Sequence, residues 1–195
     1  MTINPTLTAV DFAKLPASVR DAFLNSKAEI VTLPKDMSLF KLSAGVVKAD
    51  PKRGTLTPWW SPVQPFQEDK LGAVGRFQEA RLNKVSMREM VRFASAVSVD
   101  WNDLDNYLEV SLDESVKCFW GQYTPQPAFQ DAKSIKGRVK FFEHQAKNIY
   151  TPDILGGIEA WQFFIPNLLP AHVKVEPTIP AHDMGALAVH LGISM

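Results

Sequence analysis

Two polar side chains stand beside a glycine pair and a short apolar run in the last quarter of the sequence. The segment extends from Gly156 to Asn167 and contains Glu159 and Gln162. Its two leading glycines have a backbone freedom that residues with a Cβ lack, and residues 163–165 have the aromatic and β-branched character of a buried strand. We therefore expect Glu159 and Gln162 to lie where a loop enters a strand, facing a bound ligand.

A lone cation interrupts an apolar stretch earlier in the chain. Residues 38–43 alternate in the manner of a strand, with Leu39 and Lys41 on one face and Phe40 and Leu42 on the other. This pattern predicts a short strand in which Lys41 interrupts an otherwise apolar segment.

Two of the five tryptophans, Trp59 and Trp60, precede Ser61 in a proline-rich segment that spans residues 57–66. Its prolines forbid a helix and favour an edge strand or an irregular extended segment over a central strand; they are Pro58, Pro62 and Pro65. The segment is expected to form an extended aromatic wall.

The elements that must position these residues belong to a mixed α+β class in which strands dominate the second half. A capping box, Ser86 with Glu89, predicts a helix over 87–99. The remaining predictions are a helix over 11–30, a hairpin of strands 107–112 and 116–121, a strand over 172–176 and a helix over 186–191.

Composition narrows the function class. The chain of 195 residues is 46% hydrophobic and 22% charged, which is typical of a globular protein with one main domain. Basic and acidic residues number 21 each, so nucleic acid is not indicated as a partner. The apolar runs are too short for a membrane helix. Cys118 cannot form an internal disulfide, and the four scattered histidines predict no metal site.

The N-terminus lacks the basic start and long apolar segment of a secretory signal. We expect a cytoplasmic site of action, and export by a route that reads no such signal stays open.

The order of these parts resembles that of ADP-ribosyltransferase-like bacterial toxins. Lys41 occupies the place of the cation on the family's first strand, and Trp59, Trp60 and Ser61 are similar to its second motif beside the nicotinamide. The family's catalytic glutamate stands four residues before a proline at a strand start. Counting back from Pro166 gives Gln162, while Glu159 lies three residues earlier.

The resemblance implies an α+β fold with split β-sheets and a few helices over residues 37–195, preceded by a short helical extension over 1–36. It implies a toxin or effector that consumes NAD as its substrate without a metal, with Lys41, Trp59, Trp60 and Ser61 binding NAD. Glu159 as the catalytic residue favours ADP-ribose transfer to a macromolecule, and Gln162 favours hydrolysis by an NAD glycohydrolase. A target protein or a cognate inhibitor protein is a further implied partner.

A second hypothesis from another class stays open. A non-enzymatic interaction protein would use the aromatic and proline-rich segment 57–66 as its docking surface. It requires Trp59 and Trp60 to be exposed together, since exposed aromatic patches mark partner sites.

Overall fold

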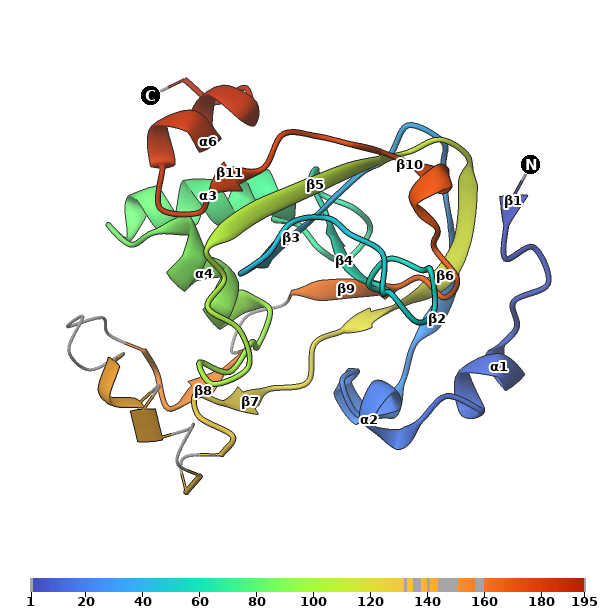
Figure 1. The fold of residues 1–195 in the computed structure, drawn as a ribbon, viewed down its shortest axis with the longest axis horizontal. Coiled ribbons are helices and arrows are strands. Elements are labelled where there is room, and N and C mark those ends of the chain that lie inside the picture. The colour runs from blue at the N-terminus through green and yellow to red at the C-terminus, as the bar shows by residue number, and fades with distance from the viewer. Residues whose placement is uncertain are drawn as a thin grey trace.

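The structure of the chain is a computed structural model that describes residues 2–131, 133–134, 138–139, 141–143, 151–156 and 160–194. A curled, mostly antiparallel sheet is combined with a few helices (Figure 1). This arrangement confirms the predicted α+β class.

Nine of the described strands form one continuous sheet. They are β1 (Thr2–Ile3), β2 (Glu29–Leu33), β3 (Ser38–Ser43), β4 (Trp59–Pro62), β5 (Asn106–Leu112), β6 (Ser115–Gln122), β9 (Trp161–Phe164), β10 (Val173–Val175) and β11 (Ile179–Pro180). The sheet follows the order β1-β6-β9-β4-β3-β5-β10, while β2 pairs with β6 and β11 with β5. Two short strands, β7 (Gln126–Pro127) and β8 (Ile154–Leu155), pair separately.

The helices lie at two ends of the sheet. The described helices are α1 (Ala9–Ala13), α2 (Ala17–Arg20), α3 (Gly72–Leu82), α4 (Met87–Ala94), α6 (Met184–His190) and the 3₁₀ turns η1 (Leu24–Ser26) and η2 (Pro170–His172). Figure 1 shows α3, α4 and α6 grouped beside β3 and β5, with α1 and α2 at the opposite end of the molecule.

Alternation along β3 divides the core. Leu39 joins one cluster with residues of β4, β5, β6 and β9, whereas Phe40 and Leu42 join a second cluster with α3, α4 and α6. This confirms the predicted two faces of the strand and places Lys41 on the Leu39 face.

The prediction of a single helix over residues 11–30 is wrong. Two short helices and a 3₁₀ turn are followed by β2, which pairs with β6. Asn25 adopts a positive φ of 56°, which interrupts any regular helix. Phe23 is fully buried against Phe119 and Phe164, so tertiary packing fixes the segment on the outside of β6 and β9.

The predicted strands over 107–112 and 116–121 exist as β5 and β6, but the predicted hairpin between them is wrong. They stand far apart in the sheet order, and β5 pairs with β3 while β6 pairs with β2 and β9. The connecting turn, Asp113-Glu114, lacks the Asn-Gly or Asp-Gly dipeptide that favours a tight hairpin. The chain therefore uses this corner to pass from one end of the curled sheet to the other.

The capping box at Ser86 and Glu89 is present in both directions, which confirms the predicted start of α4. The helix ends at Ala94 and not at residue 99. The residues that follow form a loop, and that loop borders the candidate site.

Candidate functional site

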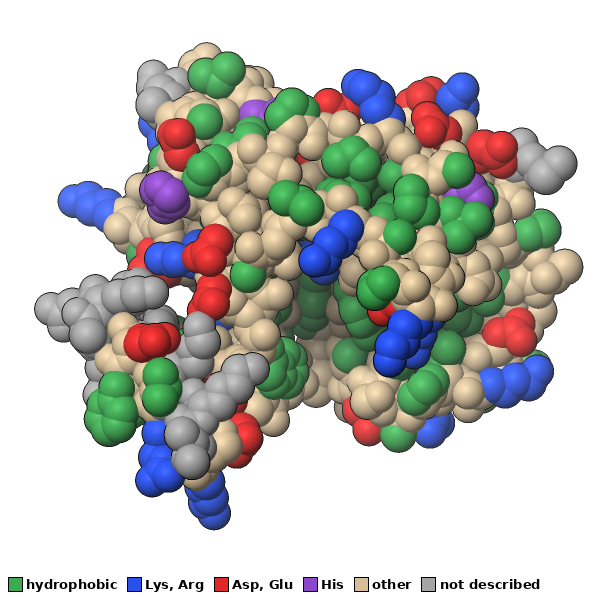
Figure 2. Space-filling view, in the orientation of Figure 1, with side chains coloured by type: hydrophobic (Ala, Val, Ile, Leu, Met, Phe, Trp, Pro, Cys, Tyr) green, Lys and Arg blue, Asp and Glu red, His purple; other side chains and the backbone are tan. Residues whose placement is uncertain are grey.

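A pocket of about 350 Å³ brings together five of the six site residues predicted from the sequence. They are Lys41, Trp59, Trp60, Ser61 and Gln162, and they come from β3, β4 and β9. Figure 2 shows the molecule hollowed near the centre of one face, with apolar side chains lining the hollow. The sixth predicted residue, Glu159, lies outside the residues that the structure describes.

Strand pairing explains how residues so distant in sequence meet. Phe40 of β3 is the register partner of Ser61, and Trp60 is the partner of Phe163 in β9. β4 is therefore an inner strand, and the expectation of an edge strand for residues 57–66 is wrong. Proline is tolerated here because Pro58 precedes the strand and Pro62 is its last residue, the register partner of Leu39, so the amides of Trp59, Trp60 and Ser61 remain free to donate.

The Lys41 amine is half-buried and has weak partners. Its Nζ lies 3.4 Å from the Thr57 Oγ1 and 6.0 Å from the centre of the Trp60 ring. Of the described lining residues, only Lys41 carries a formal charge. Burial lowers the pKa of Lys41 to about 8, because no carboxylate in the described lining offsets the loss of hydration.

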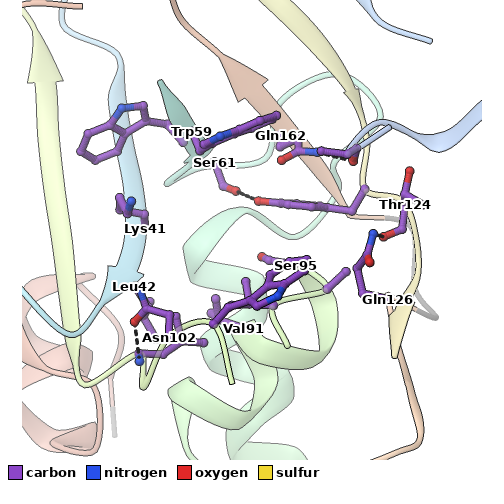
Figure 3. Close-up of a pocket in the computed structure, with 17 residues that line it drawn as sticks. Lys41, Leu42, Trp59, Ser61, Val91, Ser95, Asn102, Thr124, Gln126 and Gln162 are labelled. Atoms are coloured by element: carbon purple, nitrogen blue, oxygen red, sulfur yellow. Dashed lines mark hydrogen bonds between the residues drawn. The ribbon is translucent and has the colours of Figure 1, made fainter. Parts of the chain in front are cut away.

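A pair of hydroxyl groups lies in the middle of the pocket. The Ser61 Oγ and the Tyr123 phenolic oxygen are 2.9 Å apart, as the dashed line in Figure 3 shows. Burial raises the pKa of Tyr123 above its usual value, although its contacts with Ser61, Arg76 and Ser95 oppose that change. Tyr123 therefore stays protonated at neutral pH and remains a hydrogen-bond donor.

The side-chain amide of Gln162 uses its nitrogen in a hydrogen bond within the described part of the protein and leaves its oxygen available to a ligand. Its side chain is 3% exposed, and its Nε2 donates a hydrogen bond of 2.8 Å to the Ala22 carbonyl oxygen. The amide oxygen accepts no hydrogen bond from the described residues, and Gln162 lines the pocket. It supplies a dipole but no full charge. Figure 3 shows Gln162 and Lys41 on opposite sides of Ser61.

The loop after α4 closes another side of the pocket with Trp101 and Asn102. Arg92 holds this loop, because its guanidinium donates to the carbonyl oxygens of Val97, Ser98, Asn102 and Asp103. Burial lowers the pKa of Arg92 to about 10, and the nearby Arg88 acts in the same direction. Trp101 is 55% exposed, so it stands at the mouth of the pocket.

A buried ion pair supports the strand that carries Gln162. Arg76 and Asp69 are 2.8 Å apart, and both side chains are fully buried. The same carboxylate accepts from the amides of Leu71 and Gly72 at the start of α3 and from the amide of Trp161 at the start of β9. This network fixes β9 against α3.

The two tryptophans of β4 do not form an exposed patch. Trp60 is 2% exposed, and its indole nitrogen donates to the Thr57 carbonyl oxygen. Trp59 is half-buried, with its ring centre 4.8 Å from Phe164 in an edge-on contact. The shared exposure that the docking hypothesis requires is therefore not found.

Sequence reasoning missed several residues of the pocket, above all Tyr123, Ser95 and the 97–102 loop. Tyr123 comes one residue after β6, in a stretch of sequence that carries no motif for a ligand contact. Thr124 also lines the pocket, and its hydroxyl oxygen is buried without a partner in the described part of the chain. The arrangement offers hydroxyl and amide groups, one amine and indole walls to a flat polar ligand.

Among the described residues, no cluster of histidine, cysteine, aspartate or glutamate is arranged to hold a metal ion. Within the same residues, the helices fall short of the length and hydropathy that a bilayer span requires.

Cys118 is fully buried in the sheet, as expected for an inert thiol, and burial raises the pKa of its thiol.

No protein-family model, curated protein or solved structure matches this chain. The resemblance to ADP-ribosyltransferase-like toxins therefore stays a prediction. What supports the resemblance is that five of the residues that carry it line one pocket.

Proposed function

We propose that the protein binds NAD in this pocket and cleaves its nicotinamide glycosidic bond, passing ADP-ribose to water or to a macromolecule. The proposal includes the ADP-ribosyltransferase-like arrangement of the strands and a role as a bacterial toxin or effector. The observation that supports it most is the convergence of Lys41, Trp59, Trp60, Ser61 and Gln162 on one pocket from three strands.

The size and lining of the pocket suit one end of the dinucleotide. Ligand sites commonly have volumes of about 300–1,000 Å³, and this pocket, at about 350 Å³, stands near the lower limit. It accommodates a ring and its sugar, with the rest of NAD extending past Trp101 at the mouth. Indole faces favour a flat ring, and the hydroxyl pair of Ser61 and Tyr123 offers donors to a carboxamide.

The Lys41 ammonium is the group that binds a phosphate of NAD. It acts as a point charge and lacks the two-pronged grip of arginine. Because the described lining holds no carboxylate, an anionic group on the ligand meets no repulsion there.

Departure of nicotinamide leaves positive charge on the ribose, and a nearby anion or dipole stabilises it. The free amide oxygen of Gln162 supplies such a dipole, which supports hydrolysis over transfer. Glu159 is the carboxylate that would favour transfer to a macromolecule.

The test is incubation of the purified protein with NAD while nicotinamide and ADP-ribose are followed together by chromatography. Equal release of both products indicates a glycohydrolase. Release of nicotinamide only when cell lysate is present indicates a transferase. No nicotinamide under either condition contradicts the proposal.

Two variants assign the catalytic group. Gln162→Ala and Glu159→Gln are each compared with Gln78→Ala, which changes an exposed residue of α3 away from the pocket. We expect one of the first two variants to lower turnover at least about tenfold with its folded state intact, and Gln78→Ala to match the wild type. Normal turnover in both Gln162→Ala and Glu159→Gln contradicts the assignment of the catalytic group.

A further inference from the structure

The Lys41 side chain has the surroundings of a nucleophilic amine. Within the described residues it has no carboxylate at ion-pair distance, and its contacts are one hydroxyl and one indole ring. Burial lowers the pKa of Lys41 to about 8. At about pH 7 roughly a tenth of such an amine is neutral, compared with less than about a thousandth of an ordinary exposed lysine amine.

The pocket around this amine is shaped for a small aromatic molecule. Aliphatic side chains of Leu42, Val91 and Leu104 face the cavity together with the indoles of Trp59, Trp60 and Trp101. Figure 3 shows Lys41 at one end of the cavity, with Ser61 toward its middle, and the ring near the amine is that of Trp60. Such walls stabilise a flat ring by burying its apolar faces.

We propose that Lys41 forms a reversible imine with small aromatic aldehydes that enter this pocket. The Nζ lone pair adds to the carbonyl carbon, and a proton moves from nitrogen to the carbonyl oxygen to give a carbinolamine. Loss of one water molecule then leaves the C=N bond. No oxidant or reductant takes part, and water reverses the reaction.

This activity uses the same pocket as the proposed NAD cleavage but does not depend on it. A bound aldehyde and the nicotinamide end of NAD compete for the same volume. Aromatic aldehydes are therefore also inhibitors of any NAD turnover at this site.

The experiment traps the imine on the full chain. The protein is incubated with para-hydroxybenzaldehyde and sodium cyanoborohydride, which reduces the imine to a stable secondary amine, and the modified lysines are located by peptide mass mapping. We expect Lys41 to be labelled at least about tenfold faster than the exposed Lys52. Labelling no faster than at Lys52 overturns the proposal.

The pH profile distinguishes Lys41 from a surface amine. Its labelling rate should level off above about pH 8, because the amine is then mostly neutral. Exposed amines as a class continue to gain reactivity toward about pH 10.4. A Lys41 profile that follows the exposed class contradicts the proposal.

Matched controls test recognition by the pocket. Lys41→Met should abolish the selective adduct, and Lys52→Met should leave it unchanged. Replacing the aromatic aldehyde by glyceraldehyde, which is small and hydrophilic, should remove the preference for Lys41. Equal selectivity for both aldehydes overturns the role assigned to the aromatic walls. All of these readouts are masses, so they stand whether or not NAD is cleaved.

Discussion

The hydroxyl oxygen of Ser61 lies 2.9 Å from that of Tyr123, and this hydrogen bond joins β4 to the segment that follows β6. Tyr123→Phe removes one hydroxyl and leaves Ser61, which is buried, without this partner. We expect the free energy of unfolding to fall by about 1–3 kcal/mol. Urea denaturation measures it. A double-mutant cycle with Ser61→Ala should give a coupling of about 0.5–1.5 kcal/mol, and zero coupling contradicts the assigned bond.

The Asp69 and Arg76 pair predicts a large effect from a single substitution. Arg76→Met leaves the fully buried Asp69 carboxylate without its countercharge, so we expect a loss of about 3–5 kcal/mol in unfolding free energy. Glu176→Gln, which breaks the exposed contact with Lys174, serves as the control and should change stability by less than about 1 kcal/mol. Similar effects in the two variants would show that the buried network does not anchor β9.

Gly121 in β6 predicts a steric link between the sheet and the N-terminal segment. A Cβ at this position would stand 2.6 Å from the Phe23 Cδ1 and 2.8 Å from the Lys27 carbonyl oxygen. Gly121→Ala should therefore lower stability by about 1–3 kcal/mol and shift the Ala22 wall of the pocket. Gly45→Ala, where a Cβ meets no atom within 4 Å, is the control for thermal unfolding. Equal melting temperatures for Gly121→Ala and Gly45→Ala would refute the steric contact between β6 and the N-terminal segment.

The Lys41 amine predicts that NAD affinity depends on pH. The amine is protonated below its pKa of about 8, and only the protonated form attracts phosphate, so affinity should fall as pH rises through about 8. Tryptophan fluorescence titration with NAD measures the dissociation constant at each pH. Lys41→Arg keeps its charge throughout, and its affinity should stay flat over this range. A flat profile in the wild type would contradict phosphate binding by Lys41.

The same amine predicts a gain in folding stability at higher pH. Its pKa is lower in the folded protein than the ordinary value of 10.5, so the unfolded chain binds more protons between about pH 8 and that value. The contribution of Lys41 therefore rises with pH across this window. Urea denaturation of Lys41→Met and of the wild type across this pH range isolates the contribution of Lys41. A difference in unfolding free energy that does not change with pH argues against the lowered pKa.

Local signals in the sequence predicted local structure well. The alternation over residues 38–43 matches β3 residue for residue, and Ser86 with Glu89 marks the start of α4. Pairing between strands was not predictable in the same way, because it depends on which distant faces bury together. The missed helix α3 shows a related limit, since its buried residues include Gly72 and Arg76 and give no clear apolar stripe.

The candidate site was predictable where a residue type was unusual for its strand. Lys41 in an apolar strand and Gln162 before an aromatic run stood out for that reason. Tyr123 and Asn102 did not, because nothing in their own neighbourhood signals a pocket. Asn102 is placed by Arg92, which holds the loop after α4. Tyr123 is placed by β6, which ends one residue before it.

The most direct test of the account is nicotinamide release from NAD by the wild type and two tryptophan variants. Val97→Trp fills the pocket, and Val189→Trp places the same side chain on the exposed surface of α6. We predict release by the wild type and by Val189→Trp, and release at least about tenfold slower by Val97→Trp. No release by the wild type, or unchanged release by a folded Val97→Trp, would contradict the proposal that this pocket cleaves NAD.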